Sequence, residues 1–292
     1  MMTPPAPLLI HEEEVTFHNG QVTLAGTLLL PAAPRPCPAV ALVHGSGDDT
    51  RDDYRVYAQH FAAHGIATLI YDKRGVGAST GRWRAGTFTE LAEDALAGVR
   101  LLARREEIAA RRVGLWGCSE GGWVAPLAAS RAPDVRFLVA VSAAGMSPAM
   151  QETYRRTLLI EVGNPSRMRR AWRMAGMRLM FGTLRHAPQR LLPGMAGYFA
   201  RTMDYDPPPT WRTIIQPTLL VYGAEDKAVP PQESAEMIAS ALQAAGNHNY
   251  TIQTFPGADH GIRYYDAATQ KRAFAPGYLD AVAHWIGDGH SP

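Results

Sequence analysis

The sequence predicts a single α/β domain, in which a mostly parallel β-sheet is covered by helices on both faces. Short all-apolar runs alternate along the chain with amphipathic stretches, which is the pattern of repeated strand–helix units. A hairpin signal precedes these units, and strand signals are missing from one long segment, 146–212. With 292 residues, of which 46% are apolar, the chain is long enough to bury one large core.

The first two strands are expected at 13–19 and 21–30, joined by a tight turn at Asn19-Gly20. Asn-Gly between two β-rich runs is a strong hairpin signal, because both residues tolerate the positive φ of such a turn. Strands covered on both faces should then follow as continuous apolar runs. These runs lie at 39–43, 66–71, 113–117, 137–142 and 217–222, and a further strand is expected at 250–255.

Helices are expected between these strands, at 53–64, 89–105, 121–130, 232–245 and 272–286. The segment 146–212 carries helical signals only. Asn164-Pro165 favours a helix start within it, with Asn as N-cap and Pro in the first turn, and Pro207-Pro208-Pro209 is expected to end it. We therefore divide the chain into an α/β core, 1–145 and 213–292, and a helical insertion, 146–212.

Bulk composition excludes several classes of protein. A formal net charge of +2 is too small for a typical nucleic-acid-binding protein. Cys37 and Cys118 are too few for a secreted disulfide scaffold, so two free thiols in a reducing compartment are expected. Neither a signal peptide nor an apolar run of membrane-spanning length is recognisable, so we expect a cytoplasmic chain without stable membrane insertion.

The segment Gly117-Cys118-Ser119-Glu120-Gly121 matches Gly-x-Ser-x-Gly between a predicted strand and a predicted helix. A sharp turn there lifts the serine hydroxyl clear of the sheet, and the two glycines avoid collisions around it. Ser119 is therefore the candidate nucleophile. Cys118 is the rival, but residues two positions before and after it are Trp116 and Glu120, so we expect Cys118 to be a packing residue.

A serine that attacks a carbonyl group needs N–H donors already in place for the oxyanion. One donor is expected to be the backbone N–H of Glu120, directly after the nucleophile. The second should come from His44-Gly45-Ser46-Gly47, which follows the 39–43 strand. Ser46 is the favoured donor and Gly45 is the alternative.

Asp226 and His260 each follow a predicted strand, so they should lie near Ser119 at the carboxyl edge of the sheet. The chain order Ser, Asp, His is the one expected for a nucleophile on a strand–turn–helix elbow. His260 would be the general base and Asp226 the acid that orients it. Glu225 and Asp259 remain alternatives for the acid.

Other polar residues have structural interpretations. No cluster of His, Cys and Asp has metal-ligand spacing, so no metal or cofactor is expected, and His60, His64 and His284 are interpreted as surface or packing residues. Asp72 and Arg74 either pair with each other or brace the site. A structural role is favoured for both.

Taken together, these motifs resemble the α/β-hydrolase superfamily, and more narrowly bacterial carboxylesterases near its dienelactone-hydrolase-like and prolyl-oligopeptidase-like branches. The resemblance rests on 44–47, 71–79, 117–122, 222–226 and 257–261. It implies an eight-stranded sheet, a cap between the sixth and seventh strands, and no cofactor. Ser119 stands where dienelactone hydrolases have Cys, and where haloalkane dehalogenases and epoxide hydrolases have Asp.

The insertion 146–212 holds eleven Arg, four acidic residues and eight of the chain's eleven Met. Met168 and Trp172 share one helical face and are our candidate substrate-binding residues, since methionine repacks easily around apolar groups. The Arg excess is either a solvated face or an attraction for anionic substrates or acidic lipid surfaces.

The function expected is a carboxylesterase acting on small to medium acyl esters. An acyl-CoA thioesterase or acyltransferase with the same residues is second, because a basic cap suits CoA phosphates. A short-peptide peptidase is third. A non-catalytic binding module on the same scaffold is last, because all three candidate catalytic residues are present.

Overall fold

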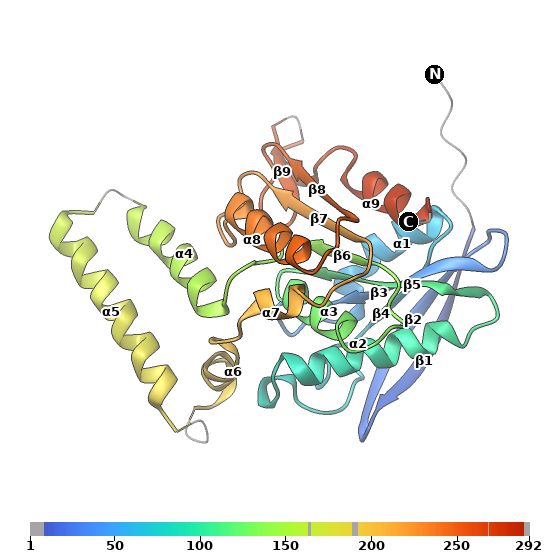
Figure 1. Ribbon diagram of the computed structural model, residues 1–292, viewed down its shortest axis with the longest axis horizontal. Coiled ribbons are helices and arrows are strands. Elements are labelled where there is room, and N and C mark those ends of the chain that lie inside the picture. The colour runs from blue at the N-terminus through green and yellow to red at the C-terminus, as the bar shows by residue number, and fades with distance from the viewer. Residues whose placement is uncertain (1–8, 163–164, 189–191, 268, 289–292) are drawn as a thin grey trace.

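The computed structural model describes residues 9–162, 165–188, 192–267 and 269–288 and contains an eight-stranded, mostly parallel sheet (Figure 1). The strand order is β1-β2-β4-β3-β5-β6-β7-β8. Strand β2 pairs antiparallel with β1 and β4, and the pairs from β4 to β8 are parallel. The predicted fold class is therefore confirmed.

The strands of this sheet are β1 (Ile10–Asn19), β2 (Val22–Pro31), β3 (Cys37–Val43), β4 (Ala67–Tyr71), β5 (Ile108–Cys118), β6 (Leu138–Val141), β7 (Thr218–Gly223) and β8 (Tyr250–Phe255). The helices are α1 (Arg55–Ala63), α2 (Phe88–Ala103), α3 (Gly121–Ala129), α4 (Pro148–Glu161), α5 (Arg167–His186), α6 (Gly194–Thr202), α7 (Pro207–Trp211), α8 (Pro231–Ala244) and α9 (Tyr278–Gly287). Two short 3₁₀ turns occur at Arg51–Tyr54 and Trp83–Ala85.

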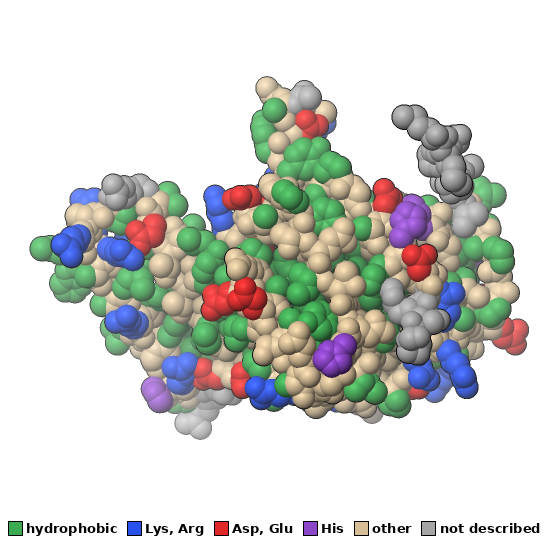
Figure 2. All heavy atoms as spheres, turned by 45° about the horizontal axis from the view of Figure 1, so that its top comes forward, with side chains coloured by type: hydrophobic (Ala, Val, Ile, Leu, Met, Phe, Trp, Pro, Cys, Tyr) green, Lys and Arg blue, Asp and Glu red, His purple; other side chains and the backbone are tan. Residues whose placement is uncertain are grey.

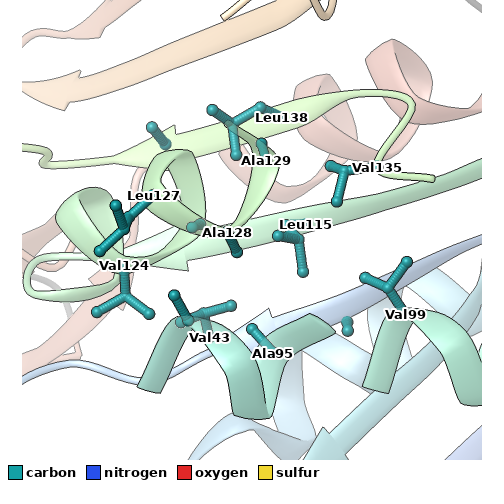
Figure 3. Close-up of a cluster of buried hydrophobic side chains, with 14 of the residues drawn as sticks. Val43, Ala95, Val99, Leu115, Val124, Leu127, Ala128, Ala129, Val135 and Leu138 are labelled. Carbon is teal, nitrogen blue, oxygen red and sulfur yellow. The ribbon is translucent and has the colours of Figure 1, made fainter. Parts of the chain in front are cut away.

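The apolar core forms a layer on each side of the sheet. Helices α2, α3 and α8 pack on one face, and α1 and α9 pack on the other. Successive side chains of β3 enter opposite layers, with Ala41 on the first side and Val40 and Leu42 on the second. Figure 3 shows the first layer, where Ala95 and Ala128 let α2 and α3 approach the strands closely.

The predicted N-terminal hairpin is present, with Asn19 opposite Val22 across the turn. Gly20 has a φ of 57°, a left-handed conformation that glycine adopts without steric cost. Strand β1 begins earlier than predicted, at Ile10, and forms one edge of the sheet.

Three predicted boundaries in the helical regions differ from the structure. The last helix begins at Tyr278 rather than 272, because 263–266 and 271–274 pair as a separate hairpin of strands β9 and β10. The residue before α5 that caps it is Ser166, and Asn164 lies outside the described residues. Pro207 starts the short helix α7 instead of ending the segment, since proline fits the first turn of a helix.

Helices α4 to α7 lie between β6 and β7 along the chain, and α4 and α5 project from the body of the molecule (Figure 1). Basic and hydrophobic side chains lie side by side on the surface of this projecting part, at the left of Figure 2. Within the described part of the chain, no helix combines the length and the apolar character needed to cross a bilayer.

Candidate active site

Ser119 lies on the sharp turn that joins β5 to α3. Its φ is 55°, in the left-handed region that a side chain other than glycine rarely adopts. A Cβ atom at Gly121 would lie 2.6 Å from the carbonyl oxygen of Val43, so the helix can approach β3 only with glycine at this position. The turn is fixed by a 2.9 Å hydrogen bond from the Ser119 N–H to the Val141 carbonyl.

Asp226 and His260 meet beyond the ends of β7 and β8. His260 Nδ1 lies 2.7 Å from Asp226 Oδ2, while Asp226 Oδ1 accepts the N–H groups of Ala228 and Val229 at 2.7 and 2.9 Å. The Asp226 side chain has no solvent exposure, whereas the His260 ring is 31% exposed. Such a carboxylate fixes the Nδ1–H tautomer of the imidazole and leaves Nε2 free to accept a proton.

The alternatives for the acid are engaged elsewhere or exposed. The carboxylate of Asp259 accepts the backbone N–H groups of Gly261 and Arg263, at 2.9 and 3.1 Å. Glu225 lies on the surface. The structure therefore brings Asp226, rather than either alternative, to His260.

The two candidate oxyanion donors differ in their hydrogen bonding. The Gly45 N–H donates to Tyr54 Oη at 2.7 Å, so it is already used. The Ser46 N–H has no acceptor among the described residues. Ser46 and Glu120 both line the cavity that contains Ser119, which leaves Ser46 as the second donor available to an oxyanion.

A buried lysine connects the two segments that carry the candidate oxyanion donors Ser46 and Glu120. Lys73 Nζ donates to the Gly45 carbonyl at 2.7 Å and to Glu120 Oε1 at 2.8 Å, and the side chains of Lys73 and Glu120 are only 2% and 3% exposed. The Gly45 carbonyl belongs to the same peptide group as the Ser46 N–H. Lys73 therefore fixes the orientation of that peptide and anchors the side chain of the other donor residue. Burial raises the pKa of the Glu120 carboxyl, and the Lys73 ammonium opposes this effect.

Sequence reasoning missed Lys73 and considered only its neighbours. Those neighbours do not pair with each other: Asp72 binds Arg51, at 3.3 Å, and Arg74 binds Asp94 through two contacts of 2.6 Å. An available signal was the placement of a lysine two residues after a buried strand, where its charge must find a partner.

His44, in the same loop, is a structural residue. Its Nε2–H donates to the Tyr71 carbonyl at 2.5 Å. Burial, aided by the nearby Lys73 charge, lowers the pKa of His44 to about 3, so the ring is neutral at physiological pH. The ring packs edge-on against Tyr54 and Tyr71 and supports the loop that carries Ser46.

Cys118 does not behave as a rival nucleophile. Desolvation, with a smaller effect of the Asp226 carboxylate, raises the pKa of the Cys118 thiol to about 12. Because the thiolate is the reactive form of cysteine, a thiol with this pKa is inert at neutral pH.

A cavity of about 760 Å³ opens above Ser119 and His260. Its floor is polar, whereas the wall that α5 and α6 supply is largely apolar. The large apolar residues are Met180, Phe181 and Leu184 of α5 and Met195 and Phe199 of α6, with Phe88 and Trp123 from the core. Helix α4 contributes Glu152, Arg155 and Arg156 to the cavity. The Glu152 carboxylate accepts hydrogen bonds from both guanidinium groups at 2.5–2.7 Å.

The candidate substrate-binding residues Met168 and Trp172 lie elsewhere. They are 72% and 75% exposed, and neither lines the cavity. Helix α5 has two apolar stripes, and the one that faces α4 and α6 contains Met177 and Phe181 instead. The predicted stripe therefore points to solvent in the structure, and the stripe with Met177 and Phe181 is the one that packs inward.

Helix α4 also touches the loop that carries the acid. Gln151 Nε2 donates to the Ala228 carbonyl at 2.5 Å, and Tyr154 Oη donates to the Asp226 carbonyl at 3.2 Å. The first helix after β6 is therefore bonded to the Asp226 loop as well as lining the cavity.

A model of the alpha/beta hydrolase family matches residues 40–273. The chain is an α/β hydrolase. This match includes Ser46, Ser119, Asp226 and His260, so every residue of the site described above lies within the family's shared region.

Several proteins resemble this α/β hydrolase. Esterase EstD from Thermotoga maritima is 25% identical over 96% of this chain and 68% of its own length. Thiohydrolase apmlB from Arthrinium phaeospermum is 32% identical over 41% of this chain and 40% of its own. Among solved structures, Est1E from Butyrivibrio proteoclasticus with bound ferulic acid has a TM-score of 0.65 at 19% identity, covering 94% of this chain and 96% of that one, which supports the fold.

Proposed function

We propose that this α/β hydrolase is a serine esterase that cleaves carboxylic esters through an acyl-enzyme intermediate. The observation that carries the proposal is the Asp226–His260 hydrogen bond of 2.7 Å, with the His260 ring and Ser119 on the wall of one cavity. Similarity to esterase EstD over 96% of the chain supports an ester substrate.

In the proposed mechanism, His260 Nε2 takes the proton of Ser119 Oγ as that oxygen attacks the ester carbonyl. The oxyanion that forms accepts the N–H groups of Glu120 and Ser46. His260 then gives its proton to the departing alcohol and leaves an acyl-enzyme. A water molecule, deprotonated by His260, attacks the acyl carbonyl, and His260 returns the proton to Ser119 Oγ as the carboxylic acid product departs. Asp226 stabilises the imidazolium throughout and keeps its carboxylate form.

The cavity supports an acyl group of medium length as substrate. A volume of about 760 Å³ lies within the range of roughly 300–1,000 Å³ that is usual for small-molecule sites. Methionine, phenylalanine and leucine side chains supply most of the large apolar groups on the wall formed by α5 and α6. Apolar burial favours longer chains by about 0.8 kcal/mol for each methylene group removed from water.

A thioesterase acting on acyl-CoA is the second candidate. Arg155 and Arg156 face the cavity with Glu152 as their shared carboxylate, so this corner carries an excess positive charge. Such a corner attracts a phosphate or carboxylate on the leaving group. The similarity of part of the chain to a thiohydrolase agrees with this alternative.

The deciding experiment compares wild type, Ser119→Ala and Ser130→Ala on p-nitrophenyl esters of increasing chain length, with an acyl-CoA series alongside. Ser130 is the matched control, because it ends helix α3 outside the cavity. We expect ester cleavage by wild type and Ser130→Ala, and background activity from Ser119→Ala. Strong preference for thioesters would favour the second candidate. Equal activity of Ser119→Ala and wild type would refute the serine mechanism.

A further inference from the structure

Two histidines and an aspartate converge on the face of the sheet that α1 and α9 cover. His60 lies in the last turn of α1, His64 follows one turn later as its C-cap, and Asp280 is in the first turn of α9. Asp280 Oδ1 lies 3.0 Å from His60 Nε2 and 3.6 Å from His64 Nε2. The three possible ligand atoms, one from each residue, all lie within 4.8 Å of one another.

The hydrogen bonding of this cluster leaves nitrogen lone pairs available. The carbonyl of His60 can only accept, so the 2.8 Å contact with His64 Nδ1 fixes the proton there and leaves His64 Nε2 as an acceptor. A backbone carbonyl that holds the far nitrogen in this way is the usual partner of a metal-ligating histidine.

His60 points to the same conclusion. Its Nε2 atom is buried, and the carboxylate oxygen Asp280 Oδ1 lies 3.0 Å away without the geometry of a good hydrogen bond. The two imidazole Nε2 atoms and the Asp280 carboxylate thus converge on one point.

We propose that His60, His64 and Asp280 bind a divalent transition metal of the zinc class, with water in the fourth position. Bonds of about 2.0–2.2 Å in a tetrahedral site place ligand atoms roughly 3.3–3.6 Å apart, and the two contacts of Asp280 Oδ1 are 3.0 and 3.6 Å. Two histidines four positions apart on a helix are a recurrent zinc-binding arrangement. Sequence analysis did not find this site because Asp280 comes from the other end of the chain.

The metal would connect α1 to the C-terminal helix. None of the three residues lines the cavity above Ser119, so the site is separate from the proposed chemistry. The carboxyl end of α1 favours positive charge, which adds to the attraction for a dication. A ligand that binds only the folded chain raises the ratio of folded to unfolded protein by about 100-fold at 100 times its dissociation constant.

The test measures Zn²⁺ binding by equilibrium dialysis and the thermal midpoint of the untagged full chain, with Mg²⁺ as the hard-cation control. Wild type should bind one equivalent of Zn²⁺ and unfold at a higher temperature with it. Loss of even an outer partner of a metal ligand costs about 10–100-fold in affinity, so His60→Ala should lose more than 10-fold. His248→Ala, which replaces an exposed histidine elsewhere, should bind as wild type does.

Asp280→Asn is the second variant, because Asp280 is 55% exposed and its replacement leaves the packing of α9 intact. It should lose both the bound Zn²⁺ and the thermal shift while melting as wild type does without metal. Absence of Zn²⁺ binding by wild type would overturn the proposal. If both His60→Ala and Asp280→Asn still bound one equivalent of Zn²⁺ and still showed the rise in thermal midpoint, the proposal would be overturned as well.

Discussion

Replacing Lys73 by methionine tests what holds the proposed oxyanion hole in place. In the native protein Lys73 Nζ contacts the Gly45 carbonyl at 2.7 Å and Glu120 Oε1 at 2.8 Å, and it lies 4.0 Å from the centre of the Trp83 ring. Methionine fills much of the same space but offers no donor. The substitution therefore leaves the buried Glu120 carboxylate without its partner and the peptide between residues 45 and 46 without its anchor.

Two magnitudes follow from this geometry. Breaking a buried ion pair by removing one member costs about 3–5 kcal/mol in the free energy of unfolding. Removing an oxyanion donor outright costs about 10²–10³ in kcat. Lys73→Met keeps the Ser46 N–H but frees its peptide to rotate, so we expect kcat to fall by about 10² with little change in KM.

The assay combines urea unfolding with kcat and KM on a p-nitrophenyl ester, for Lys73→Met, Glu120→Leu and the double variant. The double variant removes both charges, so it should regain most of the lost stability. It should not regain kcat, because the Gly45 carbonyl still lacks its donor. A wild-type kcat in Lys73→Met, or recovery of kcat in the double variant, would show that Lys73 acts on stability alone.

Other measurements address the acid, the cavity and the loop that carries Ser46. Asp226→Asn should keep the fold but lower kcat by about 10⁴, because an amide no longer selects the Nδ1–H tautomer of His260; a loss below 10-fold would contradict the assigned acid. Phe181→Ala enlarges the cavity beside α5 and should move the ester chain-length optimum upward in a kcat/KM series. An unchanged optimum would show that this wall does not contact the acyl chain. His44 has a pKa of about 3 in the folded state and an ordinary value of 6.5 when unfolded, so the unfolded chain binds the extra proton first. The free energy of unfolding should therefore fall by up to about 1.4 kcal/mol per pH unit as pH drops from 6.5 towards 3, and urea titrations of His44→Gln should lack this component.

The parts of the fold that the sequence predicted well are those set by local rules. Strands such as β3 and β7 read as continuous apolar runs because both faces are covered. The elbow around Ser119 depends on glycines whose spacing is itself the signal. Local pattern also placed Asp226 and His260, since residues that follow parallel strands meet at one edge of the sheet.

The parts that were missed depend on partners far along the chain. Helix α5 carries apolar side chains on opposite sides, and only packing against α4 and α6 decides that Phe181 is inside while Trp172 is 75% exposed. The β9–β10 hairpin lies apart from the main sheet, and its strands lack the continuous apolar runs that mark the strands of that sheet. Lys73 gains its role from Glu120 and Gly45, which no local window contains.

The hydrogen bonds from α4 to the Asp226 loop distinguish α4 from the other two helices that line the cavity, α5 and α6. Gln151 and Tyr154 tie α4 to the backbone at Ala228 and Asp226, so changes in α4 disturb the acid as well as the cavity. Among the described residues, α5 and α6 make no side-chain hydrogen bond of this kind to the Asp226 loop. Substrate range can thus diversify through α5 and α6, and an engineer grafting a foreign lid onto this scaffold should keep α4 native and place the junctions after it.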